Sequence, residues 1–126
     1  MKTIVIILVL LSMIIGLGVF FQNMLINESH EIIRGLKSIK NLIQDEKWDD
    51  AKADMTKINN RWHHIRKKWH AVTDHEQIGI IDESLARLET YISVKEKKDC
   101  LAEIAALKQN IRYIPDKEKL TFSNIF

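Results

Sequence analysis

Residues 48–72 have the sequence WDDAKADMTKINNRWHHIRKKWHAV, and this stretch decides the fold. Steps of three and four residues alternate without a miss between its apolar positions, which are Trp48, Ala51, Met55, Ile58, Trp62, Ile65, Trp69 and Val72. Such spacing keeps side chains on one face of an α-helix, so it predicts an amphipathic helix with a heptad seam. Because one helix cannot bury such a seam alone, other helices must pack against it.

The segments on either side have similar spacing and predict three more helices. Their seam positions are Leu25, Ser29, Ile32, Leu36, Ile39 and Ile43, then Ile78, Ile81, Leu85, Leu88 and Ile92, and finally Cys100, Ile104, Leu107, Ile111 and Ile114. Short connections force neighbouring helices to run antiparallel. The sequence therefore predicts an all-α fold in which residues 23–115 form an antiparallel four-helix bundle.

A weak internal repeat supports pairing of these helices into two hairpins. A shift of 49 residues places Ile43 on Ile92 and Ala51 on Cys100, and the gap across the turn is eight residues in both halves. The two hairpins could close into a bundle or stack in the manner of tetratricopeptide repeats. Local signals set the limits of the helices: Thr73 and Glu76 predict a capping box at the start of the third helix, and Pro115 predicts the end of the fourth.

The amino terminus differs in kind from the rest of the chain. Residues 3–21, TIVIILVLLSMIIGLGVFF, carry no charge, and 19 residues of helix span roughly 28 Å, close to the thickness of a bilayer core. The sequence predicts a transmembrane helix in residues 1–22. The alternative is a cleaved signal peptide, but the one small-x-small triplet, Gly16-Leu17-Gly18, lies inside the apolar run.

Charges near the apolar run suggest how the chain is oriented. Lys2 precedes the run, and the first charges that follow it are Glu28 and Glu31, although Arg34, Lys37 and Lys40 come soon after. By the positive-inside rule, a short amino-terminal tail favours a bundle on the outer side of the cytoplasmic membrane. Cleavage would instead give a secreted protein.

Composition argues against several classes of protein. Lys plus Arg is 19 and Asp plus Glu is 17, a net charge of +2, which is too even for a typical nucleic-acid-binding domain. A single cysteine, Cys100, excludes a disulfide framework and a multi-cysteine metal site within the chain. Its seam position predicts a small buried side chain, with an intermolecular disulfide as the alternative.

The densest group of cations lies in residues 61–70. The candidate interaction surface there consists of Arg61, His63, Arg66, Lys67, Lys68 and His70. Basic residues among aromatic ones are typical of sites for anionic wall polymer or lipid head groups. However, the two tryptophans of this stretch occupy the seam, and acids at the start of the next helix could pair with the cations. Those acids are Asp74, Glu76, Asp82 and Glu83.

A second candidate surface is the tail, residues 116–126, whose apolar residues are Leu120, Phe122, Ile125 and Phe126. They could pack back onto the bundle, or they could dock on a partner or a membrane.

No motif points to catalysis. His63 and His70 are two helical turns apart, about 10 Å, which is too far for one metal ion. The serines lack the glycines of a nucleophile elbow, and no glycine-rich phosphate loop occurs. We therefore expect a protein that is not an enzyme and that has no catalytic residue, cofactor, metal site or small-molecule substrate.

Several segments together resemble a known family. They are the N-terminal anchor, Trp48-Asp49-Asp50-Ala51, the run from Trp62 to Trp69, Ser84-Leu85-Ala86-Arg87-Leu88, and Ile114-Pro115 through Asn124-Ile125-Phe126. Over nearly the whole chain they resemble an uncharacterised bacterial family, domain of unknown function 4363. The resemblance implies a small single-anchor helical protein from Gram-positive, often spore-forming bacteria. It also implies a membrane-protein partner, and it carries over no catalytic residue.

The expectation from the sequence is a membrane-anchored extracytoplasmic protein that acts as a protein–protein interaction or accessory module of a membrane complex. Its partner would be a membrane protein or a second copy of the chain. The alternative is a binder of anionic wall polymer or lipid head groups through residues 61–70.

Overall fold

The computed structural model describes residues 1–125, with the side chains of residues 1–117. It contains four helices, α1 (Lys2–Gln44), α2 (Trp48–Trp69), α3 (His75–Ser93) and α4 (Lys97–Ile125), and no strand in the described range. The predicted all-α fold is confirmed, and the four heptad seams coincide with the four helices.

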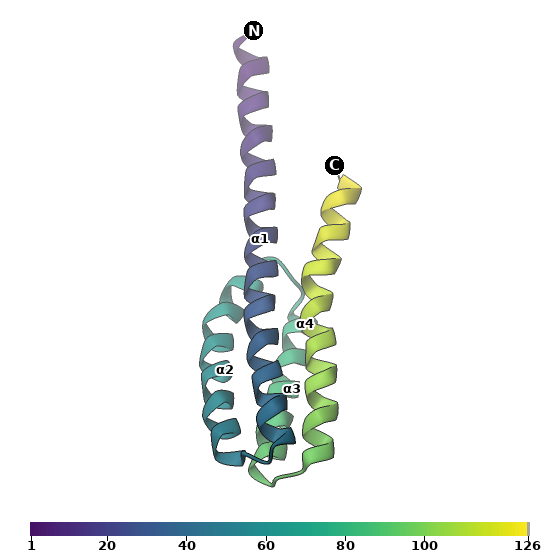
Figure 1. The fold of residues 1–126 in the computed structure, drawn as a ribbon. Helices are drawn as coiled ribbons and strands as arrows, with labels where there is room; N and C mark the ends of the chain where they lie inside the picture. Colours follow the sequence, from purple (N-terminus) through teal and green to yellow (C-terminus); the bar gives the residue numbers. More distant parts are fainter. Residues whose placement is uncertain (126) are drawn as a thin grey trace.

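Helix α1 continues without a break from the apolar amino-terminal run into the first predicted helix of the bundle. It has 43 residues. Its first half is exposed and apolar, and it is long and apolar enough to cross a membrane. From Leu25 onward the same helix contributes to the buried core. Figure 1 shows the first half of α1 projecting well beyond α2 and α3, and its amino-terminal part also beyond the end of α4.

The four helices form a closed ring rather than an open stack of hairpins. Each helix packs against two others, in the pairs α1–α2, α2–α3, α3–α4 and α4–α1. The contact between α4 and α1 closes the ring, which is the arrangement of an up-down-up-down four-helix bundle. The connection between α2 and α3 lies at the end from which α1 projects, here called the near end, and the other two turns lie at the far end (Figure 1).

The core consists of the predicted seam positions. Leu36, Ile65, Leu88 and Leu107 are fully buried, one from each helix. Only the end positions of the second seam, Trp48 and Val72, are partly exposed and pack on the edge of the core. Because the apolar spacing specified the inward face of each helix, it also specified the core.

The two hairpin turns have the same geometry. Among the described residues, two that are not glycine have a positive φ: Glu46 at 58° and Lys95, 49 residues later, at 59°. At the first turn the Glu46 N–H donates to the Ile43 carbonyl and the Lys47 N–H to the Leu42 carbonyl, as in a Schellman motif. The same pair of bonds recurs 49 residues later at the second turn. The weak sequence repeat therefore corresponds to two equivalent helical hairpins.

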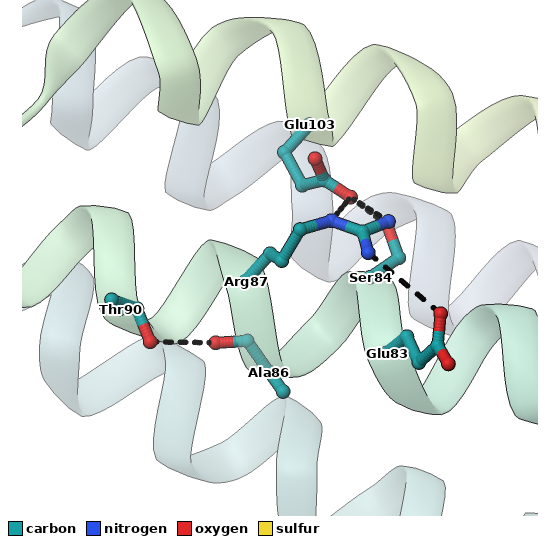
Figure 2. A network of polar contacts seen from close by, with 6 residues as sticks. All are labelled: Glu83, Ser84, Ala86, Arg87, Thr90 and Glu103. Carbon is teal, nitrogen blue, oxygen red and sulfur yellow. Dashed lines mark hydrogen bonds and ion pairs between the residues drawn. The ribbon is translucent and has the colours of Figure 1, made fainter.

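A polar network fixes α3 against α4 (Figure 2). The Arg87 guanidinium donates through Nε and Nη2 to Glu103 Oε1 at 3.2 and 3.1 Å, and the buried Ser84 hydroxyl donates to the same oxygen. On the same helix, Glu83 Oε2 lies 3.8 Å from Arg87 Nη1. The hydrogen bond that Arg87 donates to Glu103, followed by the charge of Glu103, raises the pKa of Arg87.

The predicted capping box at Thr73 is wrong. Helix α3 begins at His75, its N-cap is Asp74, and no side chain caps it. The Thr73 N–H instead donates to the Trp69 carbonyl at 2.9 Å, so Thr73 belongs to the turn that ends α2. The Thr73 hydroxyl is buried and has no hydrogen-bond partner within the described residues, so it does not supply the capping oxygen.

The predicted helix end at Pro115 is also wrong, because α4 continues through it to Ile125. Proline has no N–H, so the carbonyl of Ile111 loses its helical donor. The Ser29 hydroxyl of α1, which is 2% exposed, lies 3.5 Å from that carbonyl and donates to it. Packing of α4 on α1 thus partly satisfies the oxygen that the proline leaves free, and the backbone of the predicted tail is a continuation of the helix.

Replacement of Pro115 by alanine should stabilise the bundle. A proline inside a helix costs about 3 kcal/mol relative to alanine, and loss of the buried ring offsets part of the gain, so we expect a net gain of about 1–2 kcal/mol in the free energy of unfolding. Ser29→Ala should cost about 1 kcal/mol in the natural chain and less beside Pro115→Ala. Denaturant unfolding measures both, and a loss of stability in Pro115→Ala would contradict this account.

Candidate functional site

Most fixed cations of the predicted surface in residues 61–70 are held in ion pairs between helices. Arg61 Nε lies 2.9 Å from Glu31 Oε1 of α1, and Arg66 Nη2 lies 2.8 Å from Asp82 Oδ2 of α3. Lys68 extends to α1 as well and forms an ion pair there with a buried glutamate. The pairing that the sequence offered as an alternative explanation is therefore present, but two of its three acids come from α1 rather than α3.

Asp82 is the centre of the α2–α3 contact. It accepts a hydrogen bond from Trp62 Nε1 at 2.7 Å, in addition to two from the Arg66 guanidinium at 2.8 and 3.3 Å. Among the other acids predicted to pair with the stretch, Asp74 contacts Lys117 and Glu83 contacts Arg87. Trp62 and Arg66 of α2 thus hold α2 against α3, which explains their presence without a ligand.

The remaining members of the predicted surface are solvent-facing or lie in the turn. His63 and Lys67 are exposed. His70 stacks at a tilt on His75 of α3, with ring centroids 4.7 Å apart. Within residues 1–125, no three His, Cys, Asp or Glu side chains lie together as a metal site would require.

The tail candidates lie outside what the structure describes. The side chains of Leu120, Phe122 and Ile125 and the whole of Phe126 are not among the described parts, so the proposed docking of the tail stays a prediction.

The structure brings together a different set of cations, on the side of the bundle where α1 meets α4. Together they are called the cationic face, and its members are Arg34, Lys37, Lys40, Lys108 and Arg112. Four of the five are exposed, and Lys108 is partly buried. None of their side chains forms an ion pair or a hydrogen bond within the described residues, in contrast to the paired cations of α2.

Two hollows lie along this face. One, about 640 Å³ in volume, is lined by Lys40, Lys108, Arg112, Tyr113 and Asp116 among others. The second, about 350 Å³, shares Arg112 and adds His30, Arg34 and Lys37. Five cations and one carboxylate give these hollows a net charge of +4 with His30 neutral, whereas the whole chain carries +2.

The positive charges on this face repel one another. Partial burial lowers the pKa of Lys108, and the charges of Lys40, Lys37 and Arg112 lower it further. The two glutamates of α1, Glu31 and Glu28, are paired with Arg61 and Lys68 of α2. A negatively charged ligand would relieve the repulsion, because it would supply the missing counter-charge.

The cationic face is not evident in the sequence, because its two halves are far apart along the chain. The signal that could have revealed it is the absence of acids, since residues 32–44 and 104–115 contain five cations and no Asp or Glu. Each segment taken alone has an ordinary density of charge. Only the contact between α1 and α4 makes them one surface.

Cys100 is a core residue, as predicted from its seam position. It is 0% exposed, and burial, followed by the charges of Asp99 and Glu96, raises its pKa to about 11. A buried thiol that stays protonated is a poor nucleophile.

The fold and this site define a class of protein: a small antiparallel four-helix bundle that carries a projecting apolar helix and an open cationic face. The chain belongs to the family described as Domain of unknown function (DUF4363), whose model matches residues 19–125. No curated protein and no solved structure gives a match to the chain.

Proposed function

We propose that the chain is a single-pass membrane protein in which residues 3–21 anchor the bundle on the outer side of the cytoplasmic membrane. The observation that carries this proposal is the continuity of α1, which joins the exposed apolar segment to the core without a linker. Gly16 and Gly18, the small residues at which a signal peptide could be cleaved, lie in the middle of this helix. Retention of the segment is therefore favoured over secretion.

The anchored bundle is a non-enzymatic binding module, an accessory part of an assembly at the membrane. Support comes from its surface: Arg61 and Arg66 are paired across helices, whereas the cations of the cationic face have no ion-pair partner among the described residues. Unpaired Lys and Arg side chains on two packed helices are suited to binding an anionic surface, with no chemical step required.

Thiol labelling can test the anchor and its orientation. The natural chain is a suitable background, because Cys100 is buried and its raised pKa of about 11 keeps it unreactive. Asn60→Cys introduces an exposed thiol on α2. We expect a membrane-impermeant maleimide to label this variant in intact cells, within the membrane fraction, and to leave the natural chain unlabelled.

Two results would contradict the proposal. Labelling that requires permeabilised cells would place the bundle in the cytoplasm. A soluble mature chain that lacks the apolar segment, seen by mass spectrometry of its amino terminus, would show that the segment is a cleaved signal peptide.

A further inference from the structure

The cationic face has the properties of a binding surface for a polyanion. Arg34, Lys37 and Lys40 follow one stripe of α1 at steps of three residues, and Lys108 and Arg112 follow one stripe of α4 at a step of four. Since the two helices pack side by side, the stripes border the same two hollows. The result is a row of charges rather than a single point of positive charge.

Lipid head groups are a poor match for the face as a whole, because most of its cations stand far from the membrane, although Arg112 lies nearer, at the level of Ser29. Arg34 lies 13 residues beyond the last residue of the apolar segment, Phe21, and Lys40 lies 19 residues beyond it. Along a continuous helix these offsets correspond to about 20 and 28 Å. The head-group layer on each side of a bilayer is only about 5–8 Å thick, so the α1 cations of the face lie above it.

The chemistry of the face also argues against an acidic protein as the ligand. Centres of protein–protein interfaces are poor in lysine and rich in aromatic residues. This face has three lysines and two arginines, and Tyr113, 47% exposed, is the large aromatic side chain that lines the hollows. A surface of this kind gains its binding free energy from charge neutralisation, as in the binding of phosphate chains.

We propose that the cationic face binds a linear polyanion that carries phosphate groups, and that the projecting helix holds this face clear of the membrane so that the polymer can pass along it. This ligand class rests on the proposed function, since the height of the face matters only for an anchored bundle. The polymer lies in the hollows and meets the cations of both helices. Its phosphates replace the counter-charge that the fold does not supply.

The test is the salt dependence of binding, with the full chain in detergent micelles and fluorescent long-chain inorganic polyphosphate as the probe. For five phosphate contacts on a flexible chain, the logarithm of the affinity should fall with the logarithm of salt with a slope of about −3.5. In Lys40→Gln/Lys108→Gln, the slope should fall to about −2 and the affinity at physiological salt should drop about tenfold.

The matched control is Lys47→Gln/Lys52→Gln, which removes the same charge from exposed positions at the start of α2, a helix without contact to α4. We expect it to bind as the natural chain does. Both double variants should unfold at temperatures no lower than the natural chain, since neither removes an ion pair, and the first relieves repulsion at Lys108.

Other ligands provide the remaining arms of the test. Poly-glutamate that binds as tightly as polyphosphate would overturn the proposal in favour of an acidic protein. Competition by phosphatidylglycerol added to the micelles would overturn it in favour of lipid. Equal losses in both double variants would overturn it in favour of unspecific attraction. Because binding is measured in detergent, a bundle that proves to be cytoplasmic would refute the proposed orientation and leave this result intact.

Discussion

Replacement of Trp69 by alanine is expected to lower the free energy of unfolding by about 4 kcal/mol, the largest effect of any single substitution considered. The Trp69 side chain is 0% exposed, and its ring meets the edge of Trp62 with centroids 5.4 Å apart and planes at 87°. Truncation of a buried tryptophan costs about 3–5 kcal/mol, and the lost aromatic pair lies within that range. For a bundle of this size, the melting temperature should fall by about 15–30 °C.

Trp69→Phe separates packing from hydrogen bonding. The indole Nε1 of Trp69 is buried and has no partner within the described residues, so the phenylalanine loses no hydrogen bond there. We expect a cost of about 1 kcal/mol or less. Trp48→Ala, at the partly exposed end of the same seam, is the control and should cost less than half as much as Trp69→Ala. Equal effects at Trp48 and Trp69 would contradict the assigned core.

Removal of the ammonium group of Lys68 is expected to cause the second largest loss in the free energy of unfolding. Its Nζ lies 3.2 Å from Glu28 Oε1, and the glutamate side chain is only 7% exposed. Neither carboxylate oxygen of Glu28 has a hydrogen-bond partner within the described residues, so the lysine charge is its principal compensation. A buried charge that loses its partner costs about 3–5 kcal/mol, and water around the half-exposed lysine reduces this to about 2–3 kcal/mol for Lys68→Met.

The double-mutant cycle decides whether the cost comes from the stranded carboxylate. Glu28→Gln should be nearly neutral, because it removes the buried charge itself. In Glu28→Gln/Lys68→Met most of the stability should return, so that the two changes are strongly non-additive. Thermal unfolding of the four proteins gives the coupling. Additive losses would mean that Lys68 acts through packing of its methylene groups and not through its charge.

Local sequence rules predicted the helices and the core because heptad spacing is itself local. Each seam specifies which face of its helix is apolar, and no other chain segment is needed to recognise it. The same rules failed at Thr73 and at Pro115, where contacts with another part of the chain outweigh the local signals for a helix start and a helix end. Thr73 is held by the end of α2, and the cost of Pro115 is reduced by Ser29 of α1.

The candidate site was harder to predict than the fold, since it depends on which helices become neighbours. Residues 61–70 attracted attention by their density of charge, yet Arg61, Arg66 and Lys68 are paired across helices. The cationic face has no comparable density anywhere in the sequence. Acid-free stripes on two predicted helices, compared as possible neighbours, would have indicated it.

The unbroken course of α1 has a mechanical consequence. Each residue of an α-helix advances the chain by about 1.5 Å and turns it by about 100°. Because α1 passes from the apolar segment into the core without a joint, the number of residues between Phe21 and Leu25 sets how the bundle is rotated relative to the apolar segment. In the anchored chain that we propose, it therefore sets which way each bundle surface faces around the membrane normal. One added residue would rotate the bundle by about 100° about the axis of α1 and move it by only about 1.5 Å along that axis. Seven added residues would return the bundle to within about 20° of its original orientation and move it about 10 Å along the axis.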